Sequence, residues 1–412
     1  MGLTLGTEVV SVIQRNGLRV LSLYEGFFSG GARVLHSTVV AGLHQGGRQQ
    51  HSVLSLHHEV RREATLQRME DDPRYRALRA AGVRIGSLGR STEAGQDPRV
   101  FTEAELGAAV RQADGAHVVL SLKEQPLRLV NQDAFPGRPV IACLHRSDPE
   151  HQGDALGDLL TAADRGRLAA VVCCAESTRD AYRAAGVPAD LLRVVPNGIN
   201  LARFRPVQGA RRLALRGAAG VPSDATVVVY AARYDEMKNP ELFLRSARTF
   251  LSLEPKGHVL MCGAGMSAAN PALRDDLARI FGDRPDLLQR LDLLGVRHDM
   301  ELVYATADVV ALTSTFGEAA PLCLIEGSMC GAVPVTTPVG DAPSIVERIG
   351  FVTSFEPAEI AATWIEAAAR RAELESARTA VRPRFSHVRM IAGYSSIIER
   401  THREAALRPA RV

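Results

Sequence analysis

The chain is poor in lysine, aromatic side chains and long apolar runs. Lysine occurs only at Lys123, Lys238 and Lys256, so arginine supplies most of the 49 basic residues. Aromatic residues make up 5% of the 412 residues, and the formal net charge is only +3. This balance gives no electrostatic basis for binding nucleic acid. No apolar run approaches the length of a membrane span, so we expect no integral membrane segment.

Metal-binding and secretory signals are missing as well. The six cysteines show neither a CxxC pair nor a Cys/His ligand spacing; they are Cys143, Cys173, Cys174, Cys262, Cys323 and Cys330. Most fall in apolar runs, where cysteine acts as a small hydrophobe. The first residues, MGLTLGTEVVSVIQRNG, lack the charged start and continuous apolar stretch of a signal peptide. We therefore expect a reducing, cytoplasmic setting.

Short β-branched runs alternate with helical ones, a pattern typical of βαβ units and parallel sheets. The chain is also too long for a single core. We predict an α/β fold of two facing Rossmann-like, doubly wound domains that close on a ligand-binding cleft. The expected strands are residues 18–24, 51–57, 83–88, 116–122, 139–145 and 168–175, then 226–232, 258–264, 291–295, 308–314, 332–337 and 351–355.

A junction separates these two series of strands. It contains the PNG turn signal of RVVPNGINLARFRP, followed by a basic stretch, 202–216, without clear periodicity. We predict an N-terminal domain over 1–200 and a C-terminal domain over 201–385. The remaining segment, 386–412, is amphipathic at helical spacing, and we expect it to cross back over the first domain.

The most informative motif is a carboxylate pair in FGEAAPLCLIEGSMC. A buried strand leads to Glu318, and proline is expected in the first turn of the helix that follows. Glu326 would lie about two turns along this helix. A strand-to-helix junction offers unpaired N–H groups and a positive dipole end to an anion. The two glutamates could bind the two ends of a phosphorylated ligand. Alternatively, the first could belong to an ordinary capped helix and the second could be exposed to solvent.

Other candidate residues also follow predicted strands, where α/β folds bind ligands. Arg233 and Lys238 share one loop, suited to a diphosphate or simply solvated. Gly30 and Gly31 let backbone approach a ligand or only close a tight turn. His145 can donate to a sugar hydroxyl. Residues that can line a flat pocket after LLG are Val296 and Arg297.

Taken in order, these features resemble the retaining, nucleotide-sugar-dependent glycosyltransferases of family 4 (GT4), which have the two-domain GT-B fold. The resemblance covers the GG turn, LH, VVPNGINLARFRP, the Arg…Lys loop, LLG, and two glutamates eight positions apart before GAVPVTTPVGDAPSIV. It implies transfer of a hexosyl group to an acceptor hydroxyl with retention of anomeric configuration. It also implies no metal at the diphosphate, and the chain contains no DxD triplet.

The resemblance implies specific roles. Arg233 and Lys238 would hold the donor diphosphate, and Glu326 would accept hydrogen bonds from ribose. Glu318 would hold the transferred sugar and phosphate together with the backbone from Ala320 to Cys323, a stretch that includes Pro321 and Leu322. Further donor contacts would come from Gly30, Gly31, Val296 and Arg297, with His145 beside the sugar. His145, Lys238 and Glu318 are thus the expected catalytic residues.

This chain departs from the family pattern after the first glutamate. Many members have glycine or phenylalanine there, whereas this chain has Ala319–Ala320, and Pro321 removes an N–H group. We expect a UDP-sugar donor, with GDP and ADP open, and a small metabolite, an aminocyclitol-like core or a saccharide as acceptor. A nucleotide-sugar epimerase and a non-catalytic nucleotide-binding protein remain alternatives. A dehydrogenase is disfavoured because GxGxxG is missing.

Overall fold

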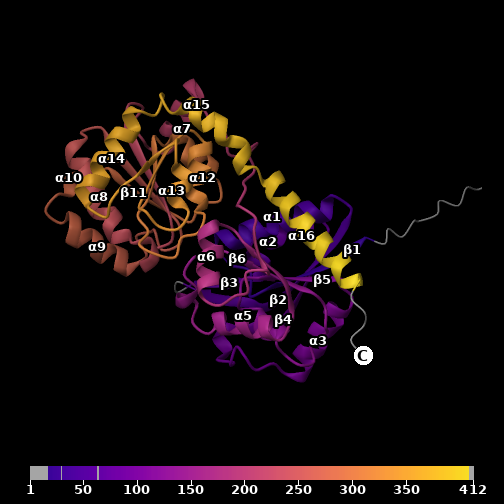
Figure 1. Cartoon of the computed structure of the whole chain (residues 1–412). Helices are drawn as coiled ribbons and strands as arrows, with labels where there is room; N and C mark the ends of the chain where they lie inside the picture. Colours follow the sequence, from indigo (N-terminus) through magenta and orange to yellow (C-terminus); the bar gives the residue numbers. More distant parts are fainter. Residues whose placement is uncertain (1–16, 29, 63–64, 408–412) are drawn as a thin grey trace, which may run out of the picture.

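The computed structural model describes residues 17–28, 30–62 and 65–407, which form two α/β domains (Figure 1). The first sheet has the strand order β3-β2-β1-β5-β6-β7-β8, and β4 also pairs with β2. The second has the order β11-β10-β9-β12-β13-β14. All strand pairs are parallel except β2 with β3. The predicted pair of Rossmann-like domains is confirmed.

The first domain has long sheet strands and helices that connect them. Its strands are β1 Leu18–Tyr24, β2 Gln49–Arg62, β3 Thr65–Arg68, β4 Arg84–Ser91, β5 Val118–Leu122, β6 Val140–Leu144, β7 Leu168–Cys173 and β8 Leu192–Val194. Its helices are α1 Gly31–Gln45, α2 Pro73–Ala80, α3 Glu103–Asp114, α4 Leu127–Val130, α5 Ala155–Asp164 and α6 Glu176–Ala184, with 3-10 turns η1 Met69–Asp71, η2 Thr92–Ala94 and η3 Pro149–Gln152.

The second domain repeats this plan. Its strands are β9 Thr226–Ala231, β10 Gly257–Cys262, β11 Leu291–Gly295, β12 Val309–Leu312, β13 Val333–Thr336 and β14 Phe351–Val352. Its helices are α7 Gly209–Ala218, α8 Pro240–Leu253, α9 Pro271–Phe281, α10 Pro285–Leu288, α11 Met300–Thr306, α12 Leu322–Met329, α13 Ala342–Val346, α14 Pro357–Ala369 and α15 Glu375–Val381, with 3-10 turns η4 Glu236–Lys238 and η5 Arg382–Phe385. The long helix α16, His387–Leu407, comes last.

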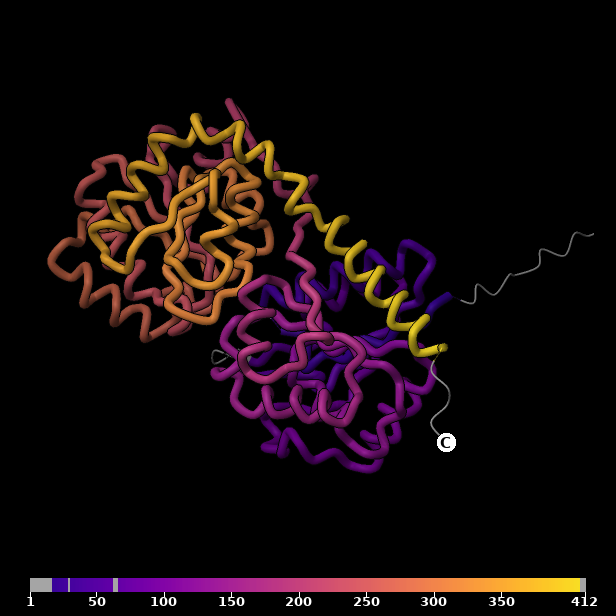
Figure 2. Tube along the Cα trace, viewed as in Figure 1, coloured from indigo at the N-terminus to yellow at the C-terminus, as the bar shows by residue number. Residues whose placement is uncertain are grey.

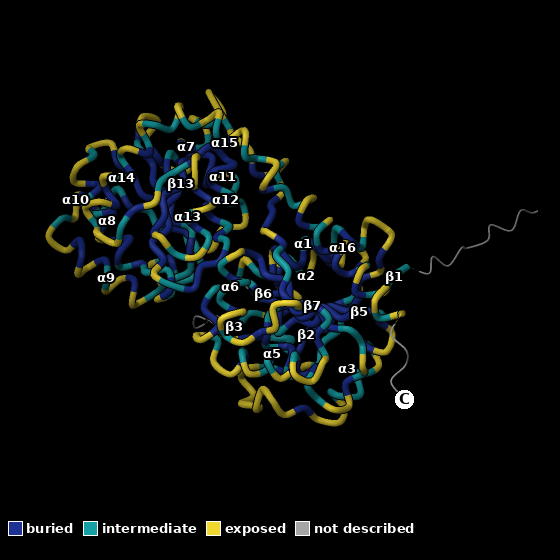
Figure 3. The backbone as a smooth tube through the Cα atoms, in the orientation of Figure 1, coloured by how far each residue is buried: buried dark blue, intermediate teal, exposed yellow. Residues whose placement is uncertain are grey.

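Both faces of each sheet are buried, because side chains alternate along a strand and helices cover both sides. In β1, Leu21 and Leu23 pack in one apolar cluster with α3 and α5. Val20 points to the other face and packs with α1 and α16. The buried parts of the chain accordingly run through the middle of each domain (Figure 3).

Helix α16 leaves the second domain and lies along the first (Figure 2). Tyr394 and Ile398 pack there against α1 and the sheet. Where the chain crosses between the domains, its two passages pair: Ile199 N–H donates to the Phe385 carbonyl at 2.8 Å, and His387 N–H donates to the Ile199 carbonyl at 2.9 Å. The domain limits predicted at 200 and 385 stay predictions, although they coincide with this paired crossing.

Every predicted strand overlaps an observed one, but two expectations about the junction were wrong. The stretch expected to lack periodicity, 202–216, contains most of α7. Its buried face carries an arginine, Arg216, which is 3% exposed, so an apolar period does not reveal it. Arg193 and Val194, which we placed in the junction, belong to the edge strand β8. Within the described ranges, none of the helices is both long enough and apolar enough to cross a bilayer.

Candidate active site

The carboxyl ends of the two sheets meet at a junction formed largely by the loop between β12 and α12. Ser147, which follows β6, donates its hydroxyl hydrogen bond to the Glu318 carbonyl. Asn197 donates its side-chain amide to the Ala320 carbonyl at 3.0 Å. Both contacts come from the first domain and end on the backbone of the second. The loop that contains the first predicted glutamate is therefore held against the first domain at two points.

The structure brings Lys238 and Glu318 together at this junction. The Lys238 ammonium donates to Glu318 Oε1, and the Ser314 hydroxyl donates to the same oxygen at 2.6 Å. The two side chains are only 15% and 6% exposed. The hydroxyl of Tyr230, on β9, donates to the Lys238 carbonyl at 2.7 Å and so fixes the turn η4. Strand β9 and the β12–α12 loop thus position a lysine and a carboxylate as one unit.

Arg233 leads the same loop after β9, five residues ahead of Lys238. Its Nη1 lies 3.3 Å from Asp235 Oδ2, and 26% of its side chain is exposed. The loop backbone lies so close to Gly263 that a Cβ there would come within 1.9 Å of the Ala232 carbonyl. This close packing fixes the backbone position of the loop that carries Arg233. Both predicted cations, Arg233 and Lys238, therefore lie in the loop at the carboxyl end of β9.

Helix α12 begins one residue later than predicted. Pro321 is its N-cap, with no side-chain cap bond, so the first N–H groups of the helix have no capping partner from that residue. Glu326 is the fifth residue of the helix, just over one turn along it rather than about two. Leu322 opens the helix, and Cys323 behind it is 9% exposed.

Glu326 lies beside the buried phenol of Tyr304. Burial raises the pKa of Glu326 to about 8, although Arg203 and a hydrogen bond with Tyr304 act in the opposite direction. The solvated second glutamate of the alternative interpretation is therefore not observed. A half-buried carboxyl at this place can bind hydroxyl groups through its oxygens.

The first domain contributes the Gly30–Gly31 turn and His145. Gly30 is the N-cap of α1, and a Cβ on Gly31 would lie 3.4 Å from Leu322 Cδ1 of the second domain. His145 directly follows β6, and neither of its buried ring nitrogens has a hydrogen-bond partner. Burial, then the charges of Lys123 and Arg33, lowers its pKa to about 3. A neutral imidazole with two unused polar atoms is ready for a ligand.

Val296 and Arg297 lie apart from this group. They follow β11, the edge strand of the second sheet. Val296 is 52% exposed, and Arg297 pairs with Asp299 at 2.6 Å. Among the described residues, neither of them forms a hydrogen bond or ion pair with Lys238, so their predicted place near the base rests on the resemblance alone.

Sequence reasoning missed Lys123. Strands β1, β5 and β6 are neighbours, and their register pairs Leu23 with Ser121 and Ser121 with Ala142. Two residues further along in each case, Lys123 therefore lies level with Leu144, the residue before His145. Lys123 has φ 68, a conformation rare outside glycine. Its ammonium makes no hydrogen bond or ion pair among the described residues, and burial and Arg33 lower its pKa to about 8. The scarcity of lysine and its place after β5 were the available signals.

Two Rossmann-like domains with largely parallel sheets, whose carboxyl strand ends meet at one junction, have the architecture of the GT-B class of glycosyltransferases. Two family profiles match this chain: "Glycosyltransferase Family 4" over residues 30–203 and "Glycosyl transferases group 1" over residues 225–370. The chain belongs to the family 4 glycosyltransferases.

Named relatives agree with this assignment. A D-inositol 3-phosphate glycosyltransferase of Saccharomonospora viridis is 32% identical over 205 residues, 48% of this chain and 46% of that protein. The homologous protein of Geodermatophilus obscurus is 31% identical over 239 residues, 56% of this chain and 51% of that protein. The matched part of the chain thus spans about half the length of these relatives.

Solved structures share the fold. Anabaena HepE, in complex with UDP and glucose, has a TM-score of 0.73 and 20% identity over 93% of this chain and all of that one. Sucrose-phosphate synthase from Thermosynechococcus elongatus has a TM-score of 0.69 and 16% identity over 94% of this chain and 100% of that one. At these identities the likeness concerns the fold.

Proposed function

We propose that this protein transfers a hexosyl group from a nucleotide-diphosphate sugar to an acceptor hydroxyl, with retention of anomeric configuration. The observation that carries the proposal is the convergence of Lys238, Glu318 and the start of α12 opposite Gly31 and His145. A UDP-sugar is the preferred donor, because solved neighbours of the same fold bind UDP and UDP-glucose. Arg233, Val296 and Arg297 complete the proposed donor site.

The reaction breaks the bond between the sugar C1 and the β-phosphate oxygen and forms a bond from C1 to the acceptor oxygen. The acceptor proton leaves to the departing phosphate, so the products are a glycoside and a nucleoside diphosphate. Negative charge builds on the diphosphate as the bond breaks. Arg233, Lys238 and the first N–H groups of α12 are fixed donors at that place, and such preorganised charges lower the barrier. In this proposal they do so without a divalent metal.

Lys238 is paired with Glu318, and this pair suggests a role for each. The carboxylate holds the ammonium in place at the junction. When a diphosphate arrives, the ammonium has two further hydrogens to donate. Glu318 can then accept hydrogen bonds from sugar hydroxyl groups. At the other end of the donor, Glu326 would bind ribose hydroxyls.

The proposed acceptor carries a phosphate. Lys123 lies beside His145 at the carboxyl end of the first sheet, with no hydrogen bond or ion pair to the described residues. Arg33 and Arg146 also lie near it, each paired with a carboxylate, that of Glu25 and that of Asp148. The relatives are D-inositol 3-phosphate glycosyltransferases by name, which supports a phosphorylated cyclitol as the first acceptor to test.

The donor is tested by incubating the protein with UDP-, GDP- and ADP-sugars and following nucleotide release with and without EDTA. The anomeric configuration of the product is read by NMR. We expect UDP release in the presence of an acceptor, unaffected by EDTA. Donor isomerisation without acceptor would favour an epimerase, and binding without turnover would favour a non-catalytic protein.

The Lys238→Ala variant tests the site. We expect loss of turnover, and also a loss of about 3–5 kcal/mol of stability because Glu318 is left buried and unpaired. The double variant Lys238→Ala/Glu318→Gln should regain stability but not activity, because the uncompensated charge is gone while the cation is still missing. Denaturant unfolding and donor turnover measure the two effects. Wild-type rates in either variant would contradict the assignment.

The acceptor is tested with inositol and inositol 3-phosphate side by side. We expect Lys123→Met to raise KM for the phosphorylated acceptor at least tenfold while donor affinity stays unchanged. Lys256→Met is the matched control, because Lys256 is 64% exposed in its side chain and pairs with Asp224 on the surface. Equal use of both acceptors by the wild type would contradict the phosphate requirement.

A further inference from the structure

A second group of charged residues lies at the amino ends of the strands of the second sheet, whereas Lys238 lies at their carboxyl ends. Asp308 directly precedes β12, and Val227 lies near the start of β9. Lys238 follows the other end of β9, which has six residues. At roughly 3.3 Å per residue, the two groups are on the order of 20 Å apart along the sheet. They are separate places in the fold.

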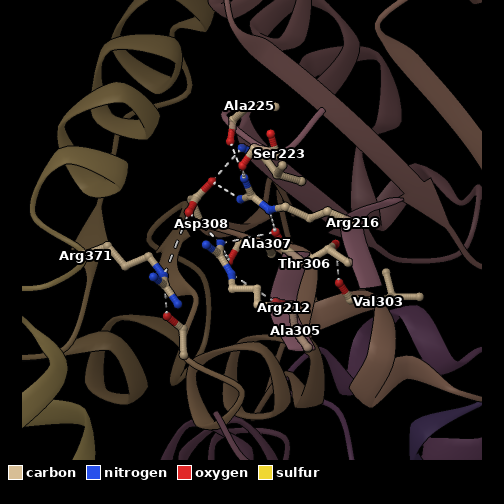
Figure 4. A network of polar contacts seen from close by, with 12 residues as sticks. Arg212, Arg216, Ser223, Ala225, Val303, Ala305, Thr306, Ala307, Asp308 and Arg371 are labelled. Atoms are coloured by element: carbon tan, nitrogen blue, oxygen red, sulfur yellow. Dashed lines mark hydrogen bonds and ion pairs between the residues drawn. The ribbon is translucent and has the colours of Figure 1, made fainter. Parts of the chain in front are cut away.

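One carboxylate serves several arginines there. Asp308 Oδ1 accepts from Arg212 at 2.7 Å, and Oδ2 accepts from Arg216 at 2.7 Å and from the Val227 N–H at 2.9 Å (Figure 4). Arg371 points toward the same carboxylate but stays 3.9 Å from Oδ1 (Figure 4). Both oxygens are therefore already used by shorter contacts, and the Arg371 Nε donates instead to the Gly331 carbonyl at 3.0 Å, so the charge of Arg371 has no carboxylate in close contact.

Arg378, on α15, is buried without a full set of partners. It is 5% exposed, its Nη2 donates to the Arg371 carbonyl at 2.7 Å, and its Nη1 has no hydrogen-bond partner. Burial and the nearby charge of Arg371 lower its pKa to about 10. A buried guanidinium nitrogen without an acceptor is costly, so it calls for a ligand.

A cavity of about 330 Å³ opens beside these side chains. Arg212, Arg371, Arg378 and Arg382 line it, with Glu375 at its exposed side. Arg382 is occupied by the Leu201, Phe204 and Met329 carbonyls. Arg212 is likewise occupied, by Asp308 and the Ala305, Thr306 and Ala307 carbonyls. Arg371 and Arg378 remain to face a space as large as a small-molecule pocket.

We propose that this cavity is a second anion site, which binds a phosphate group of a small phosphorylated metabolite through Arg371 and Arg378, with Arg212 behind them. Paired guanidinium groups suit the oxygens of a phosphate. The site adjoins η5, which precedes the paired crossing between the domains. A ligand there would bind apart from donor and acceptor.

The alternative is that all these arginines only support the fold. Arg216 is an example of such a role, because it is 3% exposed and donates to the Thr306, Ser223 and Ala225 carbonyls. Arg371 and Arg378 differ in that neither has a carboxylate in close contact: Arg371 donates its Nε to the Gly331 carbonyl at 3.0 Å and has only a long ion pair to Asp308, and Arg378 has an unused Nη1. A binding measurement separates the two interpretations.

The test is a calorimetric titration of the full chain with inorganic phosphate at constant ionic strength, with and without UDP. UDP occupies the proposed donor site, and Lys123→Met removes the proposed phosphate contact of the acceptor. Phosphate binding that persists with UDP in the Lys123→Met background therefore reports the second site. We expect Arg371→Gln and Arg378→Gln to weaken that binding at least tenfold. Arg384→Gln, a matched control that removes an exposed arginine of η5, should leave it unchanged.

The half-exposed Arg371 keeps the test usable if the Arg378 variant is unstable. Phosphate binding that is abolished by UDP, or equal in wild type, Arg371→Gln and Arg384→Gln, would overturn the proposal. Because the phosphate titration needs no glycosyl transfer, failure of the second site is distinguishable from failure of the proposed enzyme activity.

Discussion

At the scale of single residues, burial decides the chemistry of the acidic and basic groups. Glu318 is buried in direct contact with the ammonium of Lys238. Glu326 has no such cation in contact, and burial raises its pKa. Two glutamates eight residues apart therefore have different environments, as two different roles require.

The pKa of Glu326 predicts a pH dependence of stability. Its folded value is about 8 against an ordinary 4.5. The folded chain keeps a proton that the unfolded chain releases, so this group makes stability fall as the pH rises through that interval. Glu326→Gln lacks the effect, so the stability of wild type relative to the variant should decrease from about pH 5 to about pH 8 in urea unfolding. A difference that stays constant with pH would contradict the raised pKa.

A second residue-scale prediction concerns Gly340, which has φ 57 and lies against the β12–α12 loop. A Cβ there would come within 1.8 Å of the Glu318 carbonyl. Gly209 is a matched control, because its φ is 59 and nothing lies within 4 Å of its added Cβ. Gly340→Ala should cost about 1–3 kcal/mol more than Gly209→Ala, because it adds a clash to the same backbone strain. Thermal unfolding of both variants measures the difference, and equal losses would show that the loop relaxes freely.

At the scale of elements, α16 gains its stability from the domain that it crosses to. Its apolar face includes Tyr394 and Ile398, which pack against α1 and β1. Its other residues are largely polar, and an isolated helix of this kind is only marginally stable in water. Tertiary packing therefore holds α16 on the first domain.

Docking of α16 on the first domain predicts that substitutions on its two faces change the free energy of unfolding by different amounts. Ile398 is fully buried, whereas Val388 is 64% exposed. Ile398→Ala should reduce the free energy of unfolding by about 2–5 kcal/mol through lost burial and a cavity. Val388→Ala should change it by less than about 0.5 kcal/mol. Chemical denaturation tests this, and similar effects of both changes would mean that α16 is not docked as described.

At the scale of the whole molecule, one domain caps a helix of the other. The N-cap of α6 is Ala175, which has no side-chain acceptor. Asp341 of the second domain accepts instead from the Glu176 N–H at 3.0 Å and the Ser177 N–H at 2.9 Å. A carboxylate at a helix N-terminus is favoured by both hydrogen bonding and the helix dipole. This contact links helix stability to the apposition of the domains.

Asp341→Ala should therefore favour separation of the domains. We expect a loss of about 0.5–2 kcal/mol, the usual effect of removing a cap. Small-angle scattering should give a larger radius of gyration for the variant than for the wild type. Asp299→Ala is the control, because Asp299 pairs only locally with Arg297. An unchanged radius in Asp341→Ala would indicate that other junction contacts suffice.

Local patterns were enough to predict most strands and the two-domain architecture. The alternation of short apolar runs with helices follows directly from the periods of strand and helix. The sequence pattern failed in α7, where Arg216 takes the place of an apolar residue in the buried face. It also placed the start of α12 one residue early, because proline is accepted both before and within the first turn.

The sequence by itself determined which candidate residue types follow the strands: a glutamate, two arginines, two lysines and a histidine. Only the tertiary structure decided which of them meet. It joined Lys238 with Glu318 across 80 positions, set Lys123 beside His145, and left Arg297 with its neighbour Asp299. The reason is that all strands of a parallel sheet have their carboxyl ends on the same side of the sheet. The strand order, which depends on packing of the whole domain, then decides which of these ends are adjacent.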